Sequence, residues 1–234
     1  MNWKSKKGFW AGLLILVGVG LLAWFILKQE MTSQRPIEQV TITTELQQLS
    51  QKEVDGVLMP YIGNSFWEVD LNQIQSDLTR LDWVSQAVVK RSWPDQLIVS
   101  IEEQIPVVRW GDEGLMNHKG EVFFPNRLDG FENFVRLNGR LEASSQILAK
   151  FAKFQAILND LSWSIEQMSE KIDGGWQLEI LDGPQLLIAK NDDEAQLIRF
   201  VRSYDWLKNE LRNSAQVYDL RYSNGFSVKR NNTQ

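Results

Sequence analysis

The feature that most constrains this chain is an uncharged apolar run, FWAGLLILVGVGLLAWFIL, which extends from Phe9 to Leu27. As a helix rising about 1.5 Å per residue, it would cover most of the ~30 Å hydrocarbon core of a bilayer. Trp10 and Trp24 lie near its two ends, where indole rings favour the membrane interface. We therefore predict one transmembrane helix over residues 9–27.

The charges that flank this run predict its orientation. Three lysines and no acidic residue precede it: Lys4, Lys6 and Lys7. Both signs follow it: Lys28, Glu30 and Arg35. Since an excess of basic residues marks the cytoplasmic side, residues 1–8 are predicted to be a cytoplasmic stub. The rest of the chain then lies outside the cytoplasm.

A cleaved signal peptide is the alternative interpretation of the same run. It would need a shorter apolar core, of about 7–15 residues, and small residues at the cleavage site. The run is longer than that, and it ends in bulky residues, Trp24-Phe25-Ile26-Leu27. These features favour an uncleaved anchor.

The composition excludes several classes of site. There is no cysteine, which rules out disulfides, cysteine zinc sites and a cysteine nucleophile. His118 is the single histidine, so a histidine-rich metal site is impossible, and we expect no cofactor. Acidic residues outnumber basic ones by 30 to 25, and three of the basic ones precede the apolar run. A domain with a net negative charge would not bind a phosphate backbone, so nucleic acid is not an expected partner.

A first module follows a polar linker, residues 28–35, and its pattern predicts the order β-α-α-β-β. The strands combine alternation with β-branched residues, and each helix begins at a capping signal. The predicted elements are a strand at 40–43, a helix from Ser50 and Glu53 to Leu58, a helix from Asp70 and Gln73 to Leu81, and strands at 83–91 and 96–102 joined by Trp93-Pro94-Asp95.

Pro106 marks a boundary, and a second module with mixed strands and helices is predicted to extend to Lys229. The predicted strands are 107–110, 114–124 bent at 118–120, 134–137, 176–181, 185–189 and 217–222. Helices are predicted at 143–161 and 191–209, the second with an Asn191–Glu194 cap, and residues 230–234 as a disordered tail. The expected fold class is α+β with an N-terminal transmembrane helix.

Two motifs give these elements a recognisable pattern. One is W-P-D-x-L at Trp93–Leu97, and the other is D-L-R-Y-x-x-G at Asp219–Gly225. With the basic stub and the single apolar run, the chain resembles the FtsQ/DivIB family of bacterial cell division proteins. The resemblance implies a POTRA domain at 36–105 and the family's β-domain at 106–229.

The resemblance also implies a function. It implies a non-enzymatic scaffold in the inner membrane, with its C-terminal domains in the periplasm, concentrated at the division septum. The implied partners are FtsB- and FtsL-like bitopic proteins, together with FtsK-, FtsW- and FtsI-like division proteins. Such a scaffold would help to recruit and regulate septal peptidoglycan synthesis.

Two sets of site residues follow from the resemblance. Uptake of an FtsB segment by strand addition is assigned to Arg221, Tyr222, Asn224, Gly225 and Val228. A POTRA patch linked with recruitment by earlier division proteins is assigned to Gln86, Val89 and Arg91. Some family members continue beyond the glycine into a longer tail with a tryptophan, whereas Phe226–Arg230 follow it here.

The residue chemistry also favours strand addition near the C-terminus. An exposed edge strand offers unpaired N–H and C=O groups to another extended chain. Tyr222 and Phe226 would supply aromatic anchors and Arg221 a partner for a carboxylate. The alternative is that residues 217–229 form a plain hairpin closed by Asn224-Gly225, with its aromatic residues in the core.

Signals for catalysis are weak. Glu102-Glu103 and Asp192-Asp193-Glu194 are adjacent acids at element ends, where such runs are usually solvated or complete a cap. There is no S-x-x-K motif of the penicillin-binding type and no G-x-S-x-G elbow. A membrane-anchored cell-wall enzyme and a POTRA-containing secretion or outer-membrane assembly component remain the alternatives to a scaffold.

Overall fold

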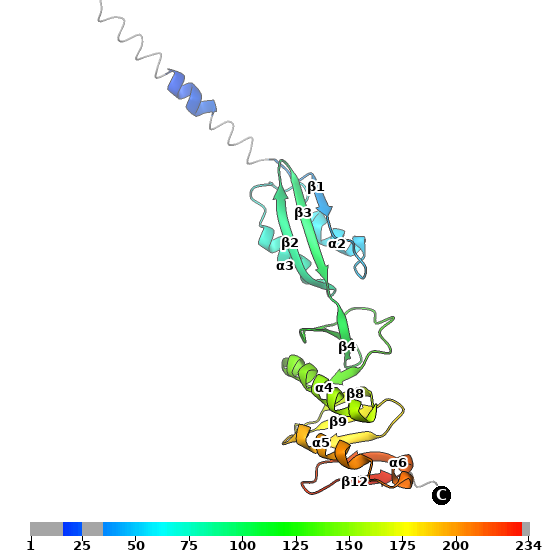
Figure 1. Cartoon of the computed structure of the whole chain (residues 1–234). Helices are drawn as coiled ribbons and strands as arrows, with labels where there is room; N and C mark the ends of the chain where they lie inside the picture. The colour runs from blue at the N-terminus through cyan, green and yellow to red at the C-terminus, as the bar shows by residue number, and fades with distance from the viewer. Residues whose placement is uncertain (1–15, 25–34, 231–234) are drawn as a thin grey trace, which may run out of the picture. The chain divides into compact units, whose positions relative to one another are not determined.

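The computed structural model describes residues 16–24 and 35–230 (Figure 1). Of the predicted membrane segment, residues 16–24 are described and helical. The remainder of that segment, the stub and residues 231–234 of the predicted tail lie outside the described residues. Within the two described ranges, no helix is long and apolar enough to cross a membrane. The chain divides into two compact units, Met1–Gln104 and Ile105–Gln234.

The first unit has the predicted order β-α-α-β-β. Its elements are β1 (Gln39–Ile42), α2 (Gln51–Leu58), α3 (Leu71–Leu78), β2 (Val84–Ser92) and β3 (Gln96–Glu103). The sheet order is β1-β3-β2, with β1 parallel and β2 antiparallel to β3. The apolar faces of both helices pack against this sheet in one buried cluster. Because β2 is the last strand in this order, its outer side is an edge of the sheet.

Both predicted helix starts are confirmed. Ser50 and Glu53 form a reciprocal capping box, in which each side chain accepts a hydrogen bond from the other residue's backbone N–H. The Asp70 carboxylate accepts from the backbone N–H groups of Asn72 and Gln73. Each cap satisfies N–H groups that have no partner within the helix, which fixes where the helix begins.

The second unit is built on a nine-stranded mixed sheet, in the order β12-β11-β10-β9-β8-β7-β4-β5-β6. The strands are β4 (Pro106–Trp110), β5 (Gly114–Asn117), β6 (Val122–Phe123), β7 (Arg136–Asn138), β8 (Ile165–Glu170), β9 (Trp176–Ile180), β10 (Gln185–Ile188), β11 (Ala215–Asp219) and β12 (Ser227–Arg230). The helices are α4 (Ser144–Leu158), α5 (Asp193–Tyr204) and α6 (Asn209–Ser214). Buried residues of α4 and α5 share one core cluster with the sheet.

Several predictions for this unit were wrong, including the tail predicted to begin at residue 230, because Arg230 belongs to β12. β8 was not predicted, because only Ile165 and Met168 of IEQMSE are buried and a bulge interrupts the alternation. The helix predicted for 191–209 ends at Tyr204, and a separate α6 follows. The Asn191–Glu194 cap is absent: Asp192 occupies the cap position in a left-handed conformation without a side-chain hydrogen bond.

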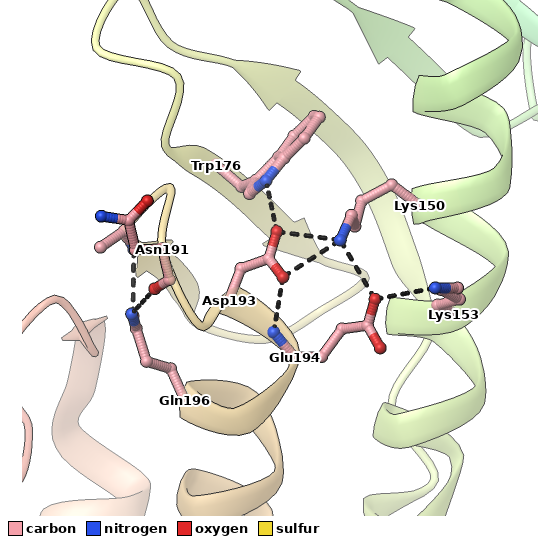
Figure 2. Close-up of polar contacts among 8 residues, drawn as sticks. Lys150, Lys153, Trp176, Asn191, Asp193, Glu194 and Gln196 are labelled. Carbon is pink, nitrogen blue, oxygen red and sulfur yellow. Dashed lines mark hydrogen bonds and ion pairs between the residues drawn. The ribbon is translucent and has the colours of Figure 1, made fainter.

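Other polar contacts hold the start of α5 in place (Figure 2). The Gln196 side-chain amide donates to the backbone carbonyl of Asn191 at 2.6 Å, and its oxygen accepts from the Ala189 N–H at 3.0 Å. The Glu194 carboxylate instead accepts from Lys150 and Lys153 of α4. The buried glutamine thus ties the segment before α5 to the helix, while Glu194 binds α4 and does not close a capping box.

A cluster of charges ties α5 to α4. The Lys150 ammonium lies 3.0 Å from the Asp193 carboxylate and 3.1 Å from that of Glu194. The Trp176 indole N–H of β9 donates to Asp193 at 3.1 Å (Figure 2). Burial opposes the charge on Lys150, but its carboxylate partners outweigh burial and raise its pKa. Hydrogen bonds from Lys153 and Lys150 lower the pKa of Glu194.

We predict that this cluster makes stability depend on pH. The pKa of Glu194 is lowered on folding, so its contribution is present above its unfolded pKa of about 4.3 and disappears as the pH falls through the folded value. Because Glu194 is partly exposed, Glu194→Gln should cost only about 0.5 kcal/mol at neutral pH. Urea unfolding at pH 7 and at pH 3 measures the difference.

Glu210→Gln is the matched control, because it makes the same chemical change at an exposed carboxylate on α6. The control should differ little from the parent protein at either pH. A Glu194→Gln penalty that is undiminished at pH 3 would contradict the charge-based explanation.

Candidate partner-binding edge

The outermost strand of the nine-stranded sheet is β12, Ser227–Arg230. It pairs with β11 in antiparallel register, and its other side is the edge of the sheet. A strand in this position has main-chain N–H and C=O groups without sheet partners. Another extended segment can use them to add a further strand.

The predicted site residues lie together on the β11–β12 hairpin. β11 ends at Asp219, not at Tyr222 as predicted, so Arg221 and Tyr222 belong to the connecting loop. Arg221, Tyr222, Asn224 and Gly225 are exposed, whereas Val228 of β12 is half-buried opposite Tyr218. The structure therefore brings four of the five onto one exposed loop and places the fifth on the edge strand.

The two aromatic residues proposed as anchors differ. The Tyr222 side chain projects from the loop, and the residue is 56% exposed. The Phe226 ring instead packs in the core, 5.2 Å from the Phe200 ring and 5.9 Å from the Tyr218 ring. Phe226 is thus a core residue, as the plain-hairpin interpretation expects, and Tyr222 is the aromatic group available at the surface.

Arg221 is held in place by Asp219. Its Nε and Nη2 groups donate to the two carboxylate oxygens at 2.8 and 2.7 Å. These hydrogen bonds hold the pKa of Asp219 below its usual value, against the opposing effect of burial. They also raise the pKa of Arg221. The guanidinium is therefore a positioned, permanently charged group beside Tyr222.

A hollow of about 520 Å³ adjoins the loop on the α5 side. Its lining includes Phe200, Trp206 and the turn residues Asn224 and Gly225. Trp206 is 89% exposed. Two arginines of α5 border the same hollow, Arg199 and Arg202. A partner segment with an apolar side chain next to an acidic residue would fit these surroundings.

The α5 side of this site was missed in the sequence. Arg199 and Arg202 are three residues apart in α5, which places them on one face of that helix, and Trp206 follows in the turn after it. That face lies opposite the apolar stripe that enters the core. A basic and aromatic stripe on a solvent-facing surface was the signal available for finding them.

The predicted patch of the first unit is divided between two faces of β2. Gln86 is exposed, but Val89 is 8% exposed and belongs to the core. The Arg91 guanidinium donates to the backbone carbonyls of Phe66, Trp67 and Val69 at 2.7, 3.2 and 2.6 Å. The three side chains do not form one surface, although the strand that carries them lies at the edge of its sheet.

The residues considered as catalytic candidates in the sequence lie in a turn or in structural hydrogen bonds and ion pairs. His118 is exposed in the turn after β5. The Glu103 carboxylate accepts from the backbone N–H groups of Gln47, Gln48 and Leu49 at 3.0–3.2 Å. Asp193 and Glu194 bind the α4 lysines described above. These carboxylates therefore stabilise loops and helix packing.

We predict that Arg91 matters for folding. Arg91→Ala would leave three carbonyl groups without a charged donor, and it should lower the free energy of unfolding by about 2–3 kcal/mol. Lys90→Ala is the control: Lys90 is the exposed neighbour on the same strand, and its removal should change stability by less than about 0.5 kcal/mol. Equal denaturation midpoints for the two variants would show that the carbonyl contacts contribute nothing.

Comparison with known proteins assigns most of the chain. The family model described as "POTRA domain, FtsQ-type" matches residues 35–104. The model "Cell division protein FtsQ/DivIB, C-terminal" matches residues 108–221. The second match ends at Arg221, so the rest of the loop and β12 lie beyond it.

Curated relatives agree with these matches. A protein named "Cell division protein FtsQ" from Allochromatium vinosum is 32% identical over 218 residues, which are 93% of this chain and 87% of that protein. Proteins of the same name from Xanthomonas campestris pv. campestris and Coxiella burnetii are 29% and 28% identical. The alignments cover 98% and 97% of this chain, and 82% and 94% of the relatives.

Proposed function

Because the chain belongs to the FtsQ/DivIB family of bacterial cell division proteins, we propose that it is a non-enzymatic scaffold of the division machinery. Its main activity would be to bind FtsB- and FtsL-type partners outside the cytoplasm. The single observation that carries this proposal is the edge strand β12, with Tyr222 and a charged Arg221 exposed beside it. Through these contacts the protein would help to recruit and regulate septal peptidoglycan synthesis, in company with FtsK-, FtsW- and FtsI-like proteins.

The membrane anchor is part of the same proposal. Residues 9–27 would form one transmembrane helix with residues 1–8 in the cytoplasm. The described part of this segment supports the idea, because its helix exposes large apolar side chains: Leu16, Val17, Val19, Leu21, Leu22 and Trp24. Such a surface is unfavourable in water and favourable in lipid. A POTRA domain at 36–105 and a β-domain at 106–229 would then lie in the periplasm.

The proposed partner contact has two components. Main-chain hydrogen bonds to β12 would supply much of the affinity, as in other strand additions. Tyr222 and the hollow beside Trp206 would select apolar side chains, and Arg221, Arg199 and Arg202 would favour acidic neighbours. A partner segment that is extended, apolar and acidic fits both components.

The POTRA patch is proposed in a modified form. The open edge of β2 would receive earlier division proteins through its main chain and through exposed side chains such as Gln86. Val89 and Arg91 would support that strand from the core side. Substitution of either residue would therefore impair recruitment by destabilising the domain.

We predict that Tyr222→Ala weakens capture of the FtsB-type partner. Truncation of an interfacial tyrosine costs about 2 kcal/mol, which is roughly 30-fold in affinity. Calorimetric titration of the chain in detergent with the extracytoplasmic part of the partner measures this. Ile172→Ala is the control, since it removes a fully exposed apolar side chain from the β8–β9 turn of the same unit, and it should bind like the parent protein.

Gly225→Glu tests the same site by blocking a partner's approach to the main chain of the loop. A Cβ added at Gly225 would meet no atom within 4 Å, so the fold should tolerate the change. The new side chain would obstruct and repel an acidic partner, so binding should fall at least as far as in Tyr222→Ala. If both variants keep the parent's thermal midpoint and the parent's affinity, the partner site lies elsewhere on this unit.

A further inference from the structure

Two exposed tryptophans lie at one end of the first unit. Trp93, in the β2–β3 turn, is 72% exposed, and Trp67, in the loop before α3, is 48% exposed. Neither belongs to the buried cluster of this unit, although one edge contact joins the Trp67 ring to buried Phe66 at 5.1 Å. Large indole groups on a solvated surface cost free energy unless something covers them.

Both tryptophans are close to Arg35, where the chain enters this unit. The Arg35 guanidinium lies 5.7 Å from the Trp93 ring centroid. The Arg35 carbonyl accepts from the Phe66 N–H at 2.8 Å, and Pro36 bridges to Ser65. Arg91, two residues before Trp93, donates to the Trp67 carbonyl. The two rings therefore mark the end of the domain to which the N-terminal segment is attached.

The linker to the predicted membrane helix is short. Residues 28–34 separate Leu27 from Arg35. Seven residues span at most about 25 Å when fully extended, and about 15 Å as a flexible coil. The opposite end of the domain lies roughly 20 Å further along β3, from Gln96 to Glu102. The end with the tryptophans is therefore held close to the bilayer surface.

The charges around the rings indicate how they would meet that surface. Within three residues of Trp67, Trp93 or Arg35 in the sequence, the basic residues Arg35, Lys90 and Arg91 do not outnumber the acids, which are Glu38, Glu68, Asp70 and Asp95. A surface without an excess of basic residues has no strong attraction for anionic headgroups, whereas indole rings favour the interfacial region of any phospholipid bilayer. The contact should therefore depend little on salt.

We propose that Trp67 and Trp93 dock this end of the POTRA domain onto the phospholipid interface of the membrane in which the chain is anchored. The inference rests on the membrane anchor proposed above. Docking would fix the height and tilt of β2, and with them the direction in which its open edge faces.

The absence of cysteine allows a direct test by spin labelling. Single cysteines would replace Leu21 in the apolar segment, Glu68 beside Trp67, and Glu102 at the far end of β3. Each full-length variant would be reconstituted in phosphatidylcholine vesicles. Accessibility of the nitroxide to oxygen and to a water-soluble nickel complex then reports its depth.

We expect the label at residue 68 to lie at headgroup depth and the label at residue 102 to lie in water. Trp67→Ala with Trp93→Ala should move the residue 68 label to the aqueous value. Trp206→Ala, which removes a still more exposed tryptophan from the other unit, should leave it unchanged. If the double variant unfolds, Trp93→Ala alone serves, because that ring is the more exposed of the two.

The outcomes separate the two proposals. If the residue 21 label lies in hydrocarbon and the residue 68 label lies in water, the docking inference is wrong and the anchor stands. If the residue 21 label itself lies in water, the proposed anchor fails. A residue 68 label that stays at the interface after both tryptophans are removed would show that other groups cause the contact.

Discussion

The position of the candidate site depends on the packing of Tyr218 against Phe200. The Tyr218 ring of β11 is fully buried, 4.9 Å from the Phe200 ring of α5. This contact fixes β11 beside β10 in parallel register. A parallel neighbour requires a crossover connection, and α5 with α6 supplies it. Burial raises the pKa of Tyr218 to about 12, so the ring stays neutral in the core over the physiological range.

The open edge follows from this arrangement. Once β11 is fixed, the hairpin can place β12 only on its outer side, where the sheet ends. Exposed edges are prone to self-association unless charged side chains protect them. Lys229 and Arg230 are exposed on β12, and they would repel a second copy of the same strand. An acidic partner strand would be accepted, so the edge can be both protected and selective.

The two charge clusters of this unit would affect the candidate site in different ways. The Lys150–Asp193–Glu194 cluster holds α5 against α4 and so keeps the wall of the hollow in place. The Arg221–Asp219 pair orients one exposed group at the loop. The first cluster affects the site through packing, whereas the second would affect it through direct contact with a partner.

The sequence predicted the first unit well because its signals are local. Capping residues at Ser50 and Asp70, the alternation of β2 and β3, and the W-P-D turn each depend on neighbours in the chain. The short strand β8 was missed because its polar residues become a strand only by pairing with β7 and β9. The cap of α5 was mispredicted because a distant pair of lysines, Lys150 and Lys153, attracts the Glu194 side chain.

In the candidate site too, features set by neighbouring residues could be predicted and features set by tertiary packing could not. Strand β11 and the Asn224-Gly225 turn were predicted from the sequence, whereas the hairpin with β12 was only the alternative interpretation. The partner role of Tyr222 was implied by the resemblance and remains a prediction. The sequence left open whether Phe226 packs in the core or is an exposed anchor, and Val89 was assigned to an exposed patch, because the side of a strand that faces the core depends on register. Trp206 and the α5 arginines were missed because only tertiary packing brings them beside residues 223–226.

Amide hydrogen exchange can show whether β12 accepts an added strand. Exchange would be measured across the full chain, free and bound to the extracytoplasmic part of an FtsB-type partner. We expect exchange at the outward-facing amides of Ser227–Arg230 to slow by about ten-fold or more on binding, corresponding to at least ~1.4 kcal/mol of added protection. The opposite edge strand of the sheet, β6 (Val122–Phe123), should be unchanged. Tight binding without protection of β12, or with protection at β6 instead, would contradict the account.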